Sequence, residues 1–462
     1  MELIAKQVCV LPHRLNCYIS CLALVLTGCL EKRVVWSPDG KIAAVISDEG
    51  LFLCDDQGAL SPLLVEHVSA ASWLPASKEL ILVQHEDLQE WSSVEKQLTR
   101  SSRDQIRAWA TQVMGSLRGG VAWEEAFATL KKQHQLEDNE VKGVQLCLRD
   151  TRAEDLKAID KVPHDALNKL DVTVVSVRRA AADHPRLKLG PTLAGGFLRP
   201  IQQPRPSPDG RFVAFVAGQD RTELYVAPSG DAATPLRVDE RQTSFYPDWT
   251  SDSRSLLYVR AMGQPGQEDE LTLGILTRRQ VQDEQGTLSR APKTEDLAGL
   301  LFDPMARVRC FKDGRIMFSS TELCLPVTEK DAPRRQQLFV LDPARQATIG
   351  RLIPNSASGG LPDSLNVFEV SPDEKHLAVA DDKGRVSLFT IATAEVTKVQ
   401  PNEGGSLKTI PDWKFPDELC FVNVPEAGSA KELEVAIRSA SGTIRLLSEN
   451  WPAEARKGLL EK

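Results

Sequence analysis

The sequence of 462 residues lacks the features of most membrane-spanning and nucleic-acid-binding proteins. No apolar stretch approaches the roughly 20 residues that a helix needs to cross a bilayer. Positive charge is not in excess either, because the chain has 56 Lys and Arg residues and 64 Asp and Glu residues, which gives a net charge of −8. Because binding to a phosphate backbone requires clustered basic residues, we expect no nucleic-acid partner.

Sequence motifs of catalytic and metal sites are missing as well. The seven histidines form no H-E-x-x-H or H-x-H pair, and neither a G-x-S-x-G elbow nor a Gly-rich phosphate loop occurs. His85, Glu86 and Asp87 are the best candidate metal ligands, but they would need a further ligand from elsewhere, and a polar loop is the simpler interpretation. We therefore predict no catalytic residue, no metal site and no cofactor.

The cysteines follow neither a zinc pattern nor a disulfide framework. After Cys29, five remain, and none of them forms a C-x-x-C pair: Cys54, Cys147, Cys310, Cys324 and Cys420. Cys310 and Cys324 are candidates for a disulfide if they lie on neighbouring strands. Isolated buried thiols are the favoured interpretation.

The first 28 residues have the layout of an export signal. Lys6, His13 and Arg14 precede a mostly apolar stretch over residues 15–28, which is too short to span a membrane. A buried N-terminal strand is the alternative interpretation of this stretch.

The export segment ends in Leu26, Thr27 and Gly28, followed by Cys29. This sequence resembles the bacterial lipobox, and the resemblance implies that residues 1–28 are removed and that Cys29 carries the lipid. The protein would then be exported and anchored to a membrane through acyl chains alone. By the same resemblance, the absence of Asp after the cysteine favours the outer membrane over the inner one.

A short motif recurs through the rest of the chain. Its clearest copies, at residues 36–41, 206–211 and 370–375, place Ser-Pro-Asp before a second apolar run. Pro fixes φ, Asp accepts hydrogen bonds from its own backbone and Gly takes positive φ, so the motif predicts a tight hairpin between two strands. Seven copies begin at Trp36, Trp73, Pro206, Trp249, Cys310, Val370 and Trp413.

These copies resemble the TolB-type, WD40-like repeats of exported bacterial β-propeller proteins. The resemblance implies an all-β fold over residues 29–450, with about seven blades of four antiparallel strands; six or eight blades are the alternatives. TolB itself has six blades and a separate α/β domain that this sequence does not show, so membership of the Tol system is not implied. The resemblance specifies a fold and hardly a function.

One gap between copies is much longer than the others, because Trp73 and Pro206 lie 133 positions apart. Over residues 92–170 the apolar residues recur with the period of a helix, and Ser101 or Ser102 is a suitable N-cap. We predict a helical insertion in the second blade, serving either as a docking surface or as a stabilising lid. Residues 451–462 form a short, charged tail that we expect to be a surface helix.

The sequence therefore predicts a non-catalytic, lipid-anchored binding or scaffold protein of the bacterial envelope. Its propeller face and helical insertion would bind a protein or peptide partner, whose identity the sequence does not reveal. The alternative is a propeller enzyme, a hydrolase or lyase acting on peptides or glycans, with its site in the central channel. Two or more buried carboxylates or histidines converging there with perturbed pKa values would favour the enzyme.

Overall fold

The computed structural model describes residues 32–159, 162–230, 234–262, 273–283, 285–289, 292–302, 306–321, 336–345, 348–351, 365–381, 386–393, 395–399, 409–423 and 433–459. The predicted signal peptide (1–28) and Cys29 lie outside the described residues. So does Cys324, and Cys310 carries a free thiol.

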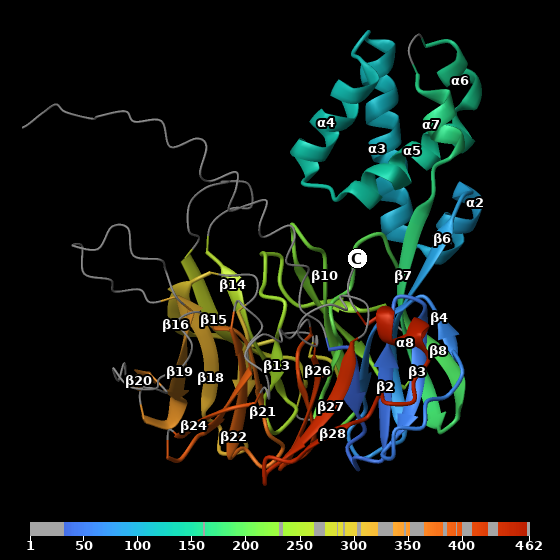
Figure 1. The fold of residues 1–462 in the computed structure, drawn as a ribbon. Helices are drawn as coiled ribbons and strands as arrows, with labels where there is room; N and C mark the ends of the chain where they lie inside the picture. Colours follow the sequence, from blue (N-terminus) through green and yellow to red (C-terminus); the bar gives the residue numbers. More distant parts are fainter. Residues whose placement is uncertain are drawn as a thin grey trace, which may run out of the picture.

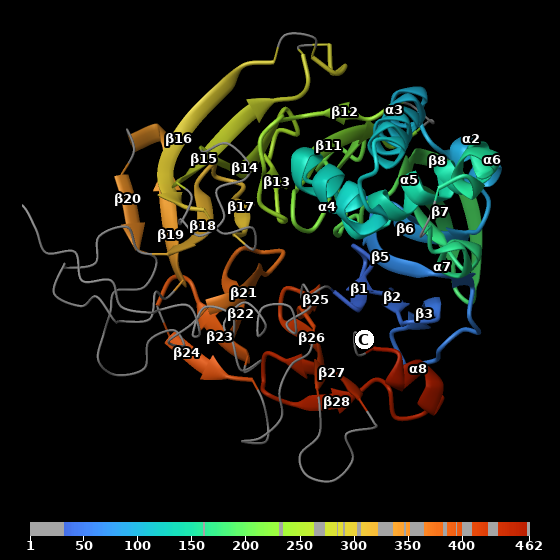
Figure 2. The ribbon, with the colours of Figure 1, turned by 90° about the horizontal axis from the view of Figure 1, so that it is seen from above.

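The strands form antiparallel sheets arranged as blades around a central axis (Figure 2). The first blade contains β1 (Val34–Trp36), β2 (Ile42–Ile46), β3 (Gly50–Asp55) and β4 (Val65–Glu66). The second contains β5 (Val68–Trp73), β6 (Glu79–Leu88), β7 (Val172–Asp183) and β8 (Arg186–Phe197). The third contains β9 (Arg205–Pro206), β10 (Phe212–Ala217), β11 (Glu223–Pro228) and β12 (Leu236–Arg237).

The remaining four blades repeat this order. The fourth contains β13 (Asp248–Trp249), β14 (Ser255–Ala261), β15 (Leu273–Gln280) and β16 (Thr294–Leu301). The fifth contains β17 (Val308–Cys310), β18 (Ile316–Thr321), β19 (Gln336–Asp342) and β20 (Thr348–Arg351), with a 3-10 turn, η1 (Pro343–Arg345). The sixth contains β21 (Leu365–Val370), β22 (His376–Asp381), β23 (Val386–Thr390) and β24 (Glu395–Lys398). The seventh contains β25 (Asp412–Phe415), β26 (Glu418–Asn423), β27 (Glu434–Ser439) and β28 (Ile444–Leu446).

The fold is therefore an all-β propeller of seven four-stranded blades, and the prediction is confirmed. The fourth and fifth blades also touch along one edge, where Leu301 of β16 pairs with Thr321 of β18. Apolar side chains of neighbouring blades pack against each other. Ala44 of β2 and Leu80 of β6, for example, belong to one fully buried cluster. Each blade thus supplies half of two interfaces, which is why its second strand is apolar on both faces.

The repeated motif forms the turn that follows the innermost strand of each blade. In the first copy, Asp39 Oδ1 accepts hydrogen bonds from Ser37 Oγ at 2.7 Å and from the Lys41 N–H at 3.2 Å. Gly40 adopts a φ of 65°, in the left-handed region. Asp209 and Asp373 accept the equivalent bonds in their copies. The repeat aspartates are turn formers.

Three of the four motif tryptophans join adjacent blades. In each of them the indole Nε1–H donates to a backbone carbonyl on the innermost strand of the preceding blade. The three pairs are Trp73 to Val35 O (2.8 Å), Trp249 to Arg205 O (2.8 Å) and Trp413 to Glu369 O (3.2 Å). An aromatic at this repeat position therefore serves both the interface core and its hydrogen bonding.

Among the strands that the structure describes, none is exchanged between the first and last blades, and the C-terminal segment covers their junction. Helix α8 (Ala453–Lys457) lies beside the first blade (Figure 1). Trp451, Ala455 and Leu459 are buried in a core shared by both blades. The segment expected to be a surface helix thus contains α8, and three of its apolar residues are turned onto the junction while Glu454 is exposed.

A helical insertion lies between β6 and β7 of the second blade and rises above one side of the ring (Figure 1). It consists of α2 (Trp91–Gln97), α3 (Arg100–Arg118), α4 (Trp123–His134), α5 (Asp138–Thr151), α6 (Ala153–Lys157) and α7 (His164–Asn168). Its apolar core, to which Ile106, Trp109 and Val144 belong, continues onto Val172 and Val174 of β7. The N-cap of α3 is Thr99, whose side chain accepts from the Ser102 N–H, and neither Ser101 nor Ser102 is the cap.

Candidate functional site

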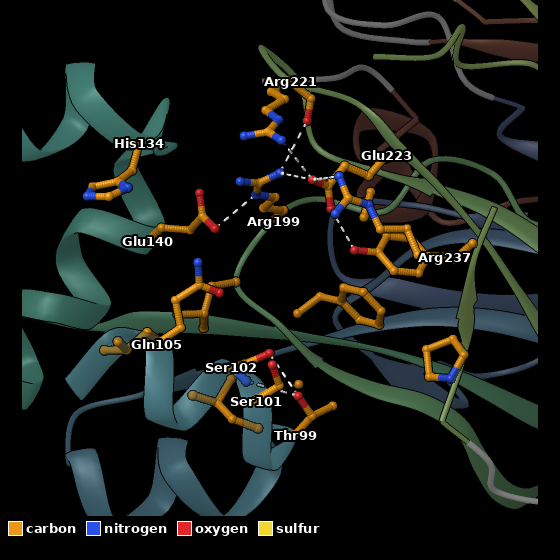
Figure 3. Close-up of a pocket in the computed structure, with 18 of the residues that line it drawn as sticks. Thr99, Ser101, Ser102, Gln105, His134, Glu140, Arg199, Arg221, Glu223 and Arg237 are labelled. Atoms are coloured by element: carbon orange, nitrogen blue, oxygen red, sulfur yellow. Dashed lines mark hydrogen bonds and ion pairs between the residues drawn. The ribbon is translucent and has the colours of Figure 1, made fainter. Parts of the chain in front are cut away.

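A cleft of about 580 Å³ lies between the helical insertion and the third blade (Figure 3). One wall is the start of α3, with the side chains of Thr99, Ser102 and Gln105. The opposite wall comes from the chain after β8 and from β11 and β12, with Arg199 and Arg237 among its residues. The cleft therefore exists only because the insertion leans over the propeller.

The insertion is held in this position by polar contacts to the second and third blades. Asn139 of α5 donates to Thr173 O at 2.7 Å and to Leu198 O at 2.9 Å, and its Oδ1 accepts from the Thr173 N–H. Glu137 accepts a hydrogen bond from the Gln219 N–H beside the third blade. These contacts fix the width of the cleft before any ligand arrives.

Close backbone packing also requires a glycine at the base of the cleft. Gly196 has a φ of +77°, and a Cβ atom there would lie 2.4 Å from Gln97 O. A larger residue would therefore push the end of β8 away from the junction of α2 and α3.

The blade wall of the cleft is a network of arginines around one carboxylate, Glu223 (Figure 3). Its Oε1 lies 3.6 Å from Arg199 Nη1, 3.6 Å from Arg221 Nη2 and 3.0 Å from Arg237 Nη2. Arg199 also pairs with Glu140 of α5, with Nε 2.9 Å from Oε1. Arg199 thus connects the insertion to the third blade electrostatically, while Arg221 and Arg237 remain partly exposed.

Tyr225 completes this wall. Its hydroxyl donates to Glu223 Oε2 at 2.6 Å. Burial and the neighbouring carboxylate raise the pKa of Tyr225, so the phenol stays protonated and acts as a donor. The floor beside it is aromatic, because the rings of Phe197 and Tyr225 pack edge to face with their centroids 5.2 Å apart. Cationic, hydroxyl and apolar surfaces are therefore all within the same cleft.

A second cleft, of about 470 Å³, adjoins the first across Gly195 and Gly196. His85 lies in its lining, with Nε2 2.6 Å from Ser69 Oγ. Burial lowers the pKa of His85, which outweighs the opposite effect of Asp87, so the ring is neutral near pH 7.

The prediction of a polar loop at residues 85–87 was wrong, since all three extend strand β6. Each side chain has its own partner: His85 contacts Ser69, Glu86 accepts from Gln97, and Asp87 accepts from Thr173. Within the described part of the chain, no group of three or more His, Cys, Asp or Glu residues is placed to hold a metal ion.

The central channel contains a ring of charged residues that sequence reasoning missed. The residue just before the motif is charged in five of the seven copies: Arg205, Asp248, Arg309, Glu369 and Asp412. Because this residue has the same position in every blade, closure of the ring brings all five together. The sequence shows a charged residue at the same position in five repeats. That these five residues meet in the channel follows only from the closed propeller.

Glu369 and Asp412 are buried, the other three charges of the channel are partly exposed, and all five are paired. Arg309 Nη1 lies 3.6 Å from Asp248 Oδ1, and its Nη2 lies 2.9 Å from Glu369 Oε2. Lys32 contacts both Glu369 and Asp412. Burial alone would raise the pKa of Glu369, but Arg309, Lys32 and Arg307 together hold it well below its usual range. This carboxylate stays ionised at neutral pH.

Neither region shows a nucleophile activated by a base among the residues that the structure describes. In the cleft, Ser102 Oγ lies 2.9 Å from Thr99 Oγ1, and His134 Nε2 contacts Gln112 instead of a hydroxyl. Nucleophilic catalysis by serine requires a base within hydrogen-bond reach.

In the ranges with described coordinates, no helix combines the length and apolarity needed to cross a membrane. Neither a protein-family model nor a curated protein matches the sequence.

Several solved propeller structures resemble the chain. TolB from Acinetobacter baumannii is 16% identical, with a TM-score of 0.40, and the match covers 59% of each chain. The β-propeller domain of the Trilobed protease from Pyrococcus furiosus is 13% identical, with a TM-score of 0.39 over 60% of this chain and 75% of that one. The β-propeller domain of Cps50 (Swd1) from Myceliophteria thermophila is 9% identical, with a TM-score of 0.42 over 85% of this chain and 94% of that one. The chain thus spans about three fifths of the TolB chain, and the assignment of the fold rests on the sheet topology above.

Proposed function

We propose that this chain is a non-catalytic binding protein of the bacterial envelope, anchored by lipid at Cys29. Its cleft between the helical insertion and the third blade would hold an extended peptide segment of a partner protein. The observation that carries the proposal is the cleft itself, which lies between the insertion and the third blade and is polar on both sides. The export and the anchor rest on the lipobox-like residues 26–29.

A peptide is the ligand class that fits this lining best. Its backbone needs donors and acceptors on both sides, and the cleft offers Ser102 and Gln105 opposite Arg221 and Glu223. Its side chains need apolar surface, which Phe197 and neighbouring residues supply. Because the walls are already held in place, little conformational entropy is lost when the ligand binds.

A propeller enzyme with a site in the channel is the second candidate, and one observation favours it. Asp248, Glu369 and Asp412 converge in the channel, as the enzyme hypothesis requires. A general acid or base, however, needs a pKa near the working pH. The pKa of Glu369 is shifted in the opposite direction, to well below its usual range, and all three carboxylates are paired with cations. Binding is the better supported function.

Site-specific photocrosslinking in intact cells tests the cleft. A photoreactive residue replaces Gln105, which is exposed and lines the cleft, and in a matched variant it replaces Ala108, which is exposed on the same helix outside the cleft. We expect a discrete protein adduct from position 105 and none from position 108. Arg221→Gln, which removes one charge from the opposite wall, should reduce the adduct at 105 several-fold.

Equal adducts at both positions would contradict docking in the cleft, and so would an unchanged adduct in the Arg221→Gln background. Production of all variants in the same strain, with circular dichroism of the purified proteins, ensures that only folded chains are compared.

A further inference from the structure

Among the described residues of the channel, the positive charges outnumber the negative ones. Four cations surround three carboxylates: Lys32 and Arg307 are buried, and Arg205 and Arg309 are largely buried. Two of these, Asp248 and Asp412, also accept backbone N–H groups of the neighbouring blade. Glu369 is left as the shared partner of all four cations.

Two of these arginines have N–H donors without a hydrogen-bond acceptor among the described residues. In both Arg205 and Arg307, the buried Nε and Nη2 atoms have no hydrogen-bond partner among the residues that the structure describes. Arg205 Nη2 approaches Glu369 Oε1 only to 3.7 Å, whereas Arg307 reaches the same oxygen through Nη1 at 2.6 Å. The Arg307 side chain is 2% exposed, so its unpaired donors carry a full desolvation penalty.

The unpaired atoms are the pair that recognises oxyanions. Nε–H and one N–H of Nη2 point from the same edge of a guanidinium, and their spacing matches two oxygens of a carboxylate or a phosphate. Arg205 and Arg307 both present this edge while standing next to one oxygen of Glu369. The Arg205 and Arg309 side chains are 14% and 13% exposed, although the unpaired atoms themselves are buried.

We propose that the channel binds one oxyanion, a carboxylate or a phosphate-type group, on the Nε–Nη2 edge of Arg205, with Arg307 as the second donor. The anion would satisfy the unpaired donors and neutralise the surplus positive charge. The pKa of Arg205 agrees with this surplus, because burial and, after it, the charge of Arg309 lower that pKa to about 10. This site shares no residue with the cleft, and its test is independent of the peptide-binding proposal.

Thermal unfolding of the purified full chain tests the site. Tm is measured in low-millimolar sodium phosphate and, separately, sodium acetate, each against sodium chloride at equal ionic strength and pH. We expect a saturable rise in Tm of roughly 2–4 °C with at least one of the two anions. A rise with phosphate alone would assign a phosphate-type ligand, and a rise with both would assign any carboxylate-sized oxyanion.

The variant Arg205→Gln should unfold cooperatively and lose the saturable rise. Arg205→Lys keeps the charge without the forked edge and should retain a smaller rise; it also tests the proposal if the glutamine variant does not fold. Arg315→Gln, at an exposed turn arginine paired with Asp313, should respond like the wild type. The proposal is overturned if neither anion gives a saturable rise, or if the rise persists undiminished in both Arg205 variants.

Discussion

The backbone N–H of Trp36 donates a 2.8 Å hydrogen bond to Oδ2 of Asp412, which lies 376 positions away. The two residues belong to the innermost strands of the first and last blades. Since no described strand is exchanged between these blades, the ring is closed by side chains such as Asp412, by apolar strand residues of both blades and by the C-terminal segment. Closure therefore combines polar contacts such as this one with an apolar core that the two blades share.

Asp412→Ala should destabilise the whole propeller. It removes the acceptor for Trp36 N–H and leaves Lys32, which is 7% exposed, without its nearest partner. Loss of one member of a buried ion pair costs about 3–5 kcal/mol. Urea unfolding should show this loss, while Asp417→Ala at the exposed turn should stay within about 0.5 kcal/mol of the wild type. Equal stability of the two variants would mean that Asp412 does not close the ring.

Glu369→Gln should change how stability depends on pH. The folded-state pKa of Glu369 is depressed, so its contribution is present above the unfolded pKa of about 4.3 and is lost as pH falls through the folded value. The variant should be less stable than the wild type at pH 7, with a smaller loss of Tm between pH 6 and pH 3.

Calorimetry over that pH range measures the effect, with Glu449→Gln at an exposed position as the control. Parallel curves for the wild type and Glu369→Gln would show that the depressed pKa of Glu369 contributes nothing to acid stability.

Gly196→Ala should loosen the helical insertion. The new Cβ would clash with Gln97 O in addition to the cost of a positive φ. Gly120→Ala is the matched control, because its φ is +86° and its Cβ would meet nothing within 4 Å. Both variants carry the backbone penalty of roughly 1 kcal/mol, and only Gly196→Ala carries the clash. We expect faster proteolysis between residues 91 and 170 in Gly196→Ala alone.

Cys29→Ser should abolish lipid attachment. Cells fed a labelled fatty acid should label the wild-type protein and leave this variant unlabelled. Cys21→Ser, in the same N-terminal segment, should label normally, because the proposed acceptor is the cysteine that follows Leu26-Thr27-Gly28. Equal labelling of Cys29→Ser and the wild type would disprove the anchor at Cys29.

The propeller was predictable from sequence because its signals are local. The Ser-Pro-Asp-Gly turn and the apolar strand after it lie within about ten residues, and every copy could be recognised separately. The insertion was predictable for the same reason, since its helical period contrasts with the strands on either side. Errors arose where local patterns allow several outcomes: the N-cap is Thr99 instead of Ser101 or Ser102, and His85 continues a strand instead of a loop.

The sequence by itself determined the repeat and the position of the insertion, and it limited the number of blades to about seven. The tertiary structure alone decided which side chains meet. Arg307 and Glu369 are 62 positions apart, and Lys32 and Asp412 are 380 apart. Side chains at such separations become neighbours only when the ring closes, and the cleft forms only when the insertion settles on the third blade. Their chemistry depends on burial and pairing, which are properties of the assembled fold and have no local signature in the chain.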